Sequence, residues 1–194
     1  MLAAMKRRTS RGVSLVEVMV AIGVLGILVS AAAPSFGDMM TRRRVRAVAA
    51  EIATDLAYAR SEAALRSQEV FLDFRANANT SCYTVQTSNT SINCNCTLDP
   101  NARCPTSDFG QSPELKTMQV ANSTGVRLTP SSATFDATTR QRVGFVAPQM
   151  LATMSDFAVD ISGGTVSLRV KMTLLGHVST CSPNGTFGGG IPSC

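Results

Sequence analysis

Six cysteines and a single histidine are the residues of this sequence whose types most readily support chemistry. The cysteines are Cys82, Cys94, Cys96, Cys104, Cys181 and Cys194. An even number of cysteines in a loop-rich region favours disulfides in an exported domain. Cys181 and Cys194 would then close a short C-terminal loop around a glycine-rich stretch. The other four cysteines allow three pairings, of which we favour Cys82–Cys94 with Cys96–Cys104.

Zinc binding by the thiolates of Cys82, Cys94, Cys96 and Cys104 is the alternative to these disulfides. The C-x-C spacing of Cys94 and Cys96 is atypical of zinc sites, and an oxidising compartment disfavours free thiolates. The single histidine, His177, has no visible catalytic partners. The sequence contains no Walker loop, nucleophile elbow or HExxH motif. We therefore expect no enzymatic activity, no cofactor and no metal ion.

A carboxylate, Glu17, lies near the start of an apolar run that extends from residue 13 to residue 33. Such a run is long enough to cross a bilayer, which takes about 20 residues. Basic residues precede the run, so the N-terminus is expected to stay in the cytoplasm while the rest is exported. The run is too long for a secretory signal peptide, and a plain membrane anchor leaves the costly charge of Glu17 unexplained.

The segment RGVSLVEVMVAIGVLGIL resembles the class III prepilin leader of type IV pilins and type II secretion pseudopilins. The resemblance implies that a prepilin peptidase removes residues 1–12 by cutting after Gly12 and that Val13 is then N-methylated. Most members have Phe at the position of Val13. Residues 13–36 would be a membrane-spanning helix that later forms filament core. Because a buried anion needs a partner, Glu17 would pair with the N-terminal amine of a neighbouring subunit during assembly.

The elements after this segment change from helical to strand periodicity. Residues 37–68 continue the helix with one apolar stripe at spacings of three and four. The stripe consists of Val45, Ala49, Ile52, Leu56, Ala59 and Ala63. Residues 69–194 show period-two runs separated by turn residues. The runs are EVFLDF, CYTVQT, TMQVA, GVRLT, ATFD, RVGFV, DFAVDIS and TVSLRVKMTLLG.

This order of elements predicts an α+β fold, in which a long N-terminal helix packs on a C-terminal antiparallel β-sheet domain. A hairpin is expected to turn at Gly163–Gly164. We interpret Gly144 as another turn glycine. The helix end EIATDLAYARSEAALRSQEVFLDF and the cysteine-bearing C-terminus are similar to the GspH/FimT/FimU group of minor pilins and pseudopilins, which has this pilin fold.

That resemblance implies a minor type IV pilin that primes or caps pilus assembly. Its partners would be other minor pilins or pseudopilins, the major pilin and the prepilin peptidase and methylase. The chain would be a single-pass protein of the bacterial inner membrane with its C-terminal domain in the periplasm, and would then enter a pilus or pseudopilus. An H-type pseudopilin of type II secretion is the first alternative, although the six cysteines argue against it.

A DNA-binding pilin for natural transformation is the second alternative. FimT-like DNA receptors carry a Gly-Arg-x-Arg motif, but the corresponding stretch here, residues 176–179, has neither arginine. The remaining candidates for phosphate contact are Arg169, Lys171 and His177. The basic run TRRRVRA, residues 41–47, is a second candidate for binding DNA or lipid phosphates. It could equally be a solvated helix face or contact an acidic neighbour.

Overall fold

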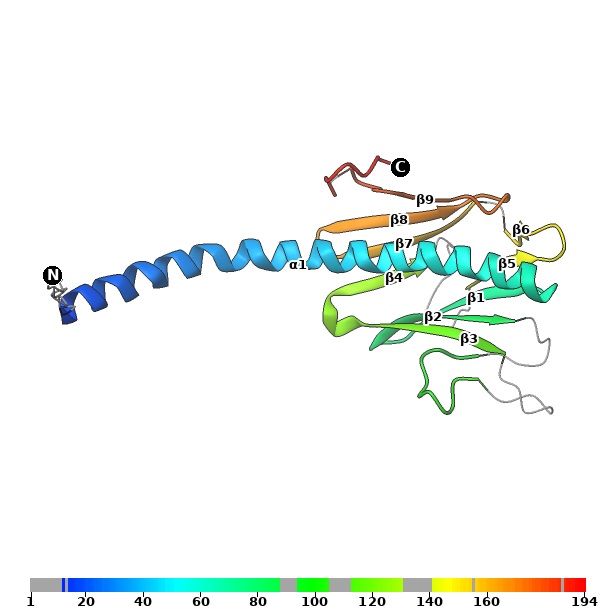
Figure 1. Ribbon diagram of the computed structural model, residues 1–194, viewed down its shortest axis with the longest axis horizontal. Coiled ribbons are helices and arrows are strands. Elements are labelled where there is room, and N and C mark those ends of the chain that lie inside the picture. Colours follow the sequence, from blue (N-terminus) through cyan, green and yellow to red (C-terminus); the bar gives the residue numbers. More distant parts are fainter. Residues whose placement is uncertain are drawn as a thin grey trace, which may run out of the picture. The chain divides into compact units, whose positions relative to one another are not determined.

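The computed structural model describes most of the chain beyond its N-terminal residues. The described residues are 12, 14–87, 94–104, 113–130, 141–154, 156–185 and 187–194. Within the helix, residues 31–35 are described by their backbone alone. The chain forms two compact units, Met1–Met39 and Met40–Cys194. Helix α1, Leu15–Arg66, begins in the first unit and ends in the second (Figure 1).

The first unit, Met1–Met39, contributes the N-terminal part of α1. Its large apolar side chains are exposed, for example Leu15 at 73%, Ile27 at 71% and Phe36 at 64%. In the part of the chain that the structure describes, there is no helix with the length and apolar character needed to cross a membrane.

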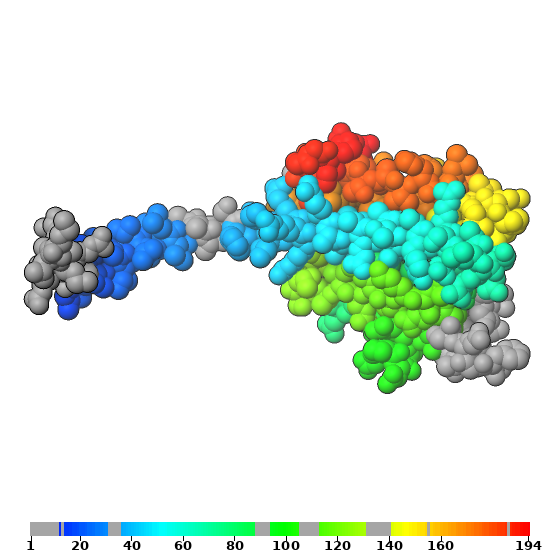
Figure 2. Space-filling model, in the orientation of Figure 1, coloured from blue at the N-terminus to red at the C-terminus, as the bar shows by residue number. Residues whose placement is uncertain are grey.

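The second unit, Met40–Cys194, buries the predicted helical stripe completely. The six stripe residues are between 0 and 2% exposed. Spacings of three and four residues place them on one face of α1, and that face packs on the β-strands. The prediction of this apolar face is confirmed. Figure 2 shows the opposite face of α1 (cyan) at the surface, with β8 and β9 (orange to red) on one side and β3 (green) on the other.

Two antiparallel sheets complete the second unit within the described residues. The five-stranded sheet has the order β3-β2-β1-β5-β6, and the four-stranded sheet has the order β4-β7-β8-β9. The first sheet consists of β1 (Val70–Ala76), β2 (Thr80–Thr87), β3 (Glu114–Ala121), β5 (Gln141–Val146) and β6 (Leu151–Ala152). The second consists of β4 (Val126–Pro130), β7 (Phe157–Gly163), β8 (Val166–Met172) and β9 (Val178–Cys181).

A single core lies between α1 and the inner faces of both sheets. Phe74 packs against Tyr83 within the first sheet and against Phe157 of the second, with ring centroids 5.2 and 5.6 Å apart. A short 3₁₀ turn, Asn122–Thr124, leads from β3 into β4. The amide of Leu128 on β4 donates to Oγ of Ser81 on β2. The α+β fold with a helix packed on antiparallel β-structure is therefore confirmed, with two sheets in place of one.

Three details of the strand prediction are corrected. The hairpin turns at Gly164–Thr165, because Gly163 pairs with Val166. Gly144 lies inside β5 opposite Phe71 and is not a turn residue. A Cβ atom there would lie 2.6 Å from Cδ1 of Phe71, so only glycine allows the ring to lie across the strand. The sequence also missed the short strands β6 and β9, and the run ATFD lies outside the described residues.

Candidate functional site

The N-terminal end of α1 carries the residues that sequence reasoning singled out for processing and assembly. Gly12 is exposed and precedes the helix, which begins at Leu15, while Val13 lies outside the described residues. Glu17 occupies the first helical turn, where the positive end of the helix dipole favours a carboxylate. It has no hydrogen-bond or ion-pair partner within the described residues, and apolar side chains surround it along the helix. A contiguous exposed apolar surface of this kind is typical of a site that contacts another protein or a membrane.

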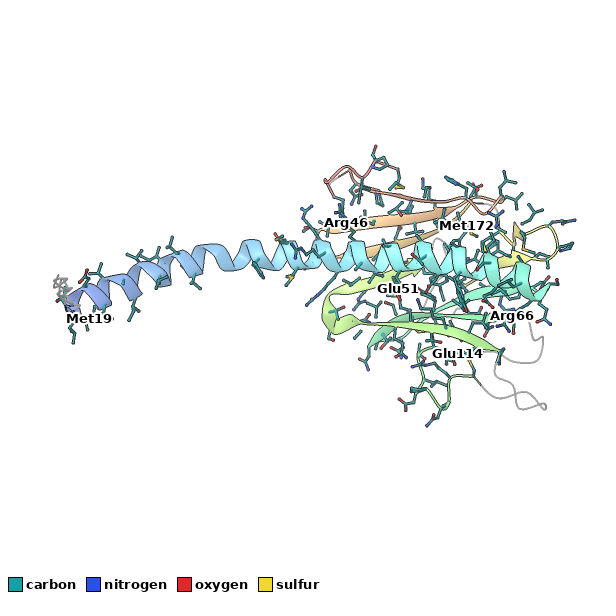
Figure 3. All side chains as sticks on the ribbon, in the orientation of Figure 1. Met19, Arg46, Glu51, Arg66, Glu114 and Met172 are labelled. Atoms are coloured by element: carbon teal, nitrogen blue, oxygen red, sulfur yellow. A yellow bond between two sulfur atoms is a disulfide. The ribbon has the colours of Figure 1, made fainter. Side chains whose placement is uncertain are left out.

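The basic run of residues 41–47 contacts the chain's own C-terminal half. Arg42 donates to the carbonyl of Phe187 at 2.9 Å, and Arg44 donates to that of Thr124 at 3.1 Å. The guanidinium of Arg46 lies 5.5 Å from the centroid of the Phe187 ring, and Figure 3 shows Arg46 on the side of α1 near β8 and β9. Arg42 and Arg46 hold the C-terminal loop against the helix, and Arg44 contacts the turn between β3 and β4, so their charges are partly used within the molecule.

The described cysteines form three disulfides, Cys82–Cys96, Cys94–Cys104 and Cys181–Cys194. The C-terminal pairing agrees with the prediction, while the pairing that we favoured for the other four is wrong. The amide of Asn95 donates to the carbonyl of Arg103 at 2.6 Å. Because antiparallel pairing of residues 95 and 103 sets residue 94 opposite residue 104, these two cysteines meet each other. The sulfur atoms of these four cysteines are all in disulfide bonds and are not free thiolates, which overturns the zinc alternative.

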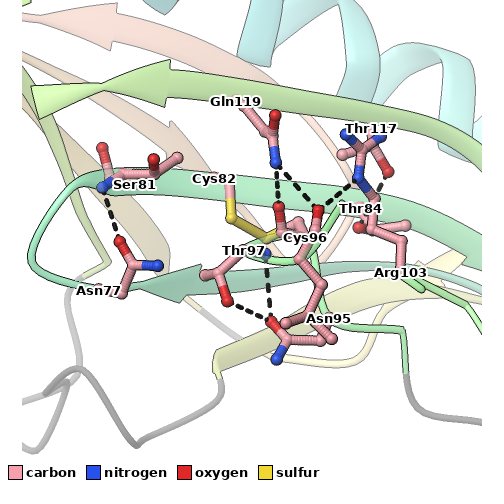
Figure 4. Close-up of a disulfide and its surroundings, with 12 residues drawn as sticks. Asn77, Ser81, Cys82, Thr84, Asn95, Cys96, Thr97, Arg103, Thr117 and Gln119 are labelled. Carbon is pink, nitrogen blue, oxygen red and sulfur yellow. Dashed lines mark hydrogen bonds between the residues drawn. A yellow bond between two sulfur atoms is a disulfide. The ribbon is translucent and has the colours of Figure 1, made fainter. Parts of the chain in front are cut away.

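The disulfide-linked segment covers the outer face of the five-stranded sheet. Side chains that point away from the core, such as Asp73, Thr84 and Gln86, are at most 1% exposed. The side-chain amide of Gln119 donates to the carbonyl of Cys96, and the Cys82–Cys96 bridge lies beside it (Figure 4). Asp73 accepts two hydrogen bonds from Arg142, at 2.9 and 3.1 Å, so its buried charge is paired.

A second buried carboxylate, Asp55, links α1 to the first sheet. It is 2% exposed and accepts hydrogen bonds of 2.7 Å from both Tyr83 and Lys116. Burial, together with the hydrogen bond to Asp55, raises the pKa of Tyr83 far above its ordinary value. The hydrogen bond to Asp55 likewise raises the pKa of Lys116. Sequence reasoning missed this cluster, because the spacing of Asp55 on the helix gives no signal of a partner on β2 or β3.

The three candidates for phosphate contact do not form one site. Asp160 on β7 pairs with Arg169 on β8 through two hydrogen bonds of 2.6 and 2.7 Å, and the pairing raises the pKa of Arg169. The hairpin could have revealed this pair, because a two-residue turn at Gly164–Thr165 sets residue 160 opposite residue 169. Lys171 lines a hollow with Arg169 and Asp156, whereas His177 lies in the turn between β8 and β9 and lines a separate groove. An arginine paired with Asp160, a lysine that shares its hollow with Asp156, and a histidine in a separate groove make a weak site for phosphate.

Comparisons with known proteins match two regions of the chain. A family model described as "Type II transport protein GspH" matches residues 48–176, more than half of the chain. A second, described as "Prokaryotic N-terminal methylation motif", matches residues 7–33. No curated protein matches. Among solved structures, the minor pseudopilin EpsH from the type 2 secretion system of Vibrio cholerae is similar at 16% identity and a TM-score of 0.43. The alignment covers 72% of this chain and 97% of EpsH.

Proposed function

The chain belongs to the GspH family of type IV pilins and pseudopilins, and from this premise we propose that it is a minor type IV pilin that primes or caps pilus assembly. In this proposal its partners are other minor pilins and the major pilin, which it meets through the N-terminal half of α1. The family is one of structural subunits, and the protein acts here as a substrate of the prepilin peptidase and methylase.

The observation that carries this proposal is the contrast between the two parts of α1. The apolar stripe from Val45 to Ala63 is fully buried within the chain, while apolar residues from Leu15 to Val29 are about half to three-quarters exposed. An apolar helix surface of this extent needs lipid or neighbouring subunits to cover it. The carboxylate of Glu17 on this surface makes subunits the better cover in the filament, because a neighbouring amine can neutralise it.

The match of the methylation motif to residues 7–33 supports the processing step of the proposal. The peptidase cuts between Gly12 and Val13, and the new amine of Val13 is methylated but stays cationic. Before assembly, residues 13–36 hold the subunit in the bacterial inner membrane. The C-terminal domain then lies in the periplasm, where its three disulfides are stable.

A second candidate function is that of an H-type pseudopilin in a type II secretion system. The description of the matched family, which names type II transport, favours it. Both functions use the same helix, the same processing and the same kind of partners, so a cellular phenotype is the discriminating observation.

The experiment is a gene deletion scored in parallel for surface pili, secreted proteins and DNA uptake. The proposal expects loss of pili with normal secretion, and restoration of pili by the intact gene. Loss of secretion with normal pili would support the pseudopilin function instead. Loss of DNA uptake with normal pili and secretion would contradict both and favour a DNA receptor.

A further inference from the structure

A groove of about 460 Å³ opens between the last turns of α1 and the turn that joins β8 to β9. Its helix wall includes three small side chains, Ala57, Ser61 and Ala64, beside Arg60. Its opposite wall includes Met150 and Leu175. The small side chains fill little of the space beside α1, so the groove has room for side chains of an incoming segment.

Large apolar side chains stand exposed at this end of the domain. Leu175 is 71% exposed, its neighbour Leu174 is 46% exposed, and Leu65 is 79% exposed. Leu65 lies one turn after Ser61 and therefore extends the groove side of the helix. Adjacent exposed leucines next to an open groove are typical of an interaction site rather than of scattered surface residues.

A guanidinium, that of Arg60, lines the groove and carboxylates do not. Arg60 and His177 belong to its lining, which includes neither Asp nor Glu. Gly176 adopts a φ of 75°, and a Cβ atom there would lie 3.2 Å from Nη1 of Arg60, so glycine lets the turn approach the guanidinium. Arg60 has no hydrogen-bond or ion-pair partner in the described part of the chain. The nearby carboxylate of Glu62 is taken by Arg66 at 2.6 Å.

From this geometry we infer that the groove binds an acidic, aliphatic segment of another protein. Aliphatic side chains of that segment lie between the α1 residues and Leu175, and its carboxylate accepts hydrogen bonds from Arg60, which has the planar donor geometry that carboxylates match. The single guanidinium of the lining is too little for nucleic acid, whose affinity rests on several phosphate contacts. The inference goes beyond the proposed assembly role, because the groove belongs to Met40–Cys194 and does not include Glu17.

The test uses the full chain in mild detergent and a fluorescent synthetic peptide of alternating leucine and glutamate. Empty micelles serve as the blank, and matched leucine–glutamine and leucine–lysine peptides test the charge. Binding is followed by fluorescence anisotropy. We expect the leucine–glutamate peptide to bind and Arg60→Glu to weaken that binding about tenfold or more, because it sets like charges together. Arg43→Glu, the same change at an exposed arginine of α1 outside the groove, is the matched control and leaves binding unchanged.

A second pair of variants tests the apolar wall. Leu175→Ser is expected to weaken binding several-fold, while Leu98→Ser, at a leucine that is 44% exposed elsewhere, is not. Thermal unfolding checks that each variant is folded, and Arg60→Gln replaces Arg60→Glu if the latter is not. Equal binding of the leucine–glutamine peptide, or equal loss in both members of a pair, would overturn the inference. So would displacement of the peptide by duplex DNA or by anionic lipid vesicles at lower concentrations than by unlabelled peptide.

Discussion

The hydroxyl of Tyr83 on β2 donates a 2.7 Å hydrogen bond to Oδ2 of Asp55 on α1, and both residues are almost completely buried. The other carboxylate oxygen accepts from Lys116, which also donates to Glu51, one helical turn before Asp55, at 3.0 Å. Figure 3 shows Glu51 in the part of α1 that lies over the sheets. One buried charge therefore fixes how far along α1 the first sheet docks.

Tyr83→Phe is expected to lower the free energy of unfolding by about 1–3 kcal/mol, because it leaves Oδ2 of Asp55 buried without a donor. Chemical denaturation measures this change, and an unchanged m-value would show that the unfolded state is not altered. Tyr58→Phe is the control, since Tyr58 is partly exposed and its hydroxyl has no hydrogen-bond partner within the described residues. Equal losses in both variants would contradict a specific role for the bond.

Stability is expected to fall as the pH rises above about 10, the ordinary value of the tyrosine pKa. The pKa of Tyr83 is raised by its burial and by Asp55, so the folded state keeps a proton that the unfolded state loses. The pKa of Lys116 is raised by the same carboxylate, which acts in the same direction. Below the unfolded-state pKa values both contributions are fully present. Unfolding followed across alkaline pH measures the effect, which should be shallower in Tyr83→Phe.

The tyrosinate absorbance of a Tyr58→Phe variant provides the independent check, because Tyr83 is then the remaining tyrosine. We expect its ionisation to coincide with unfolding. Ionisation near pH 10 in a chain that is still folded would contradict the prediction.

The disulfide pairing can be tested with double variants. Replacing Cys82 and Cys96 together by serine removes one native bridge and is expected to leave no free thiol. Replacing Cys82 and Cys94 removes one cysteine from each of two bridges and leaves Cys96 and Cys104 without their native partners. Thiol alkylation under denaturing conditions, read by mass spectrometry, distinguishes these outcomes. Free thiols in the first variant and none in a Cys82/Cys94 double variant would support the pairing expected from sequence instead.

Gly144→Ala is expected to lower the free energy of unfolding by about 1–3 kcal/mol, the usual range for adding atoms to a packed site. The new Cβ would lie 2.8 Å from Cα of Phe71, and backbone cannot move aside as a flexible side chain can. Arg142 adds to the constraint, since its guanidinium stacks 4.5 Å above the same ring. Gly37→Ala is the matched helical control with open space around it and is expected to stabilise the helix slightly. Denaturant midpoints of the two variants give the comparison.

The helix was predictable because its signal is local. Buried residues such as Ile52 and Leu56 repeat at helical spacing within one segment, and that spacing alone defines the face. The division into two sheets was not predictable from the sequence, since nothing in β4 or β5 indicates which strand each will pair with. The disulfide pairing also depends on non-local contacts. A backbone hydrogen bond between Asn95 and Arg103 sets Cys94 opposite Cys104. The Asp160–Arg169 pair was within reach, because a tight turn fixes the register of its hairpin.

Glu17→Ala tests the proposed assembly role of the N-terminal helix. We expect cleavage after Gly12 to continue, because the peptidase site is intact, while incorporation into filaments is lost. The physical reason is that the subunit then has no anion to pair with the N-terminal amine of its neighbour, which must be buried with it in the filament. Immunoblots of the membrane and sheared-filament fractions measure processing and incorporation separately.

Gly12→Ser is the complementary variant, expected to leave a longer, uncut precursor in the membrane fraction and none in filaments. The two variants separate processing from assembly, since one should change the size of the protein and the other only its location. Glu17→Asp, which keeps the charge on a shorter side chain, should assemble better than Glu17→Ala if charge pairing is the cause. Normal incorporation of Glu17→Ala into filaments would rule out the pairing role of the carboxylate in assembly.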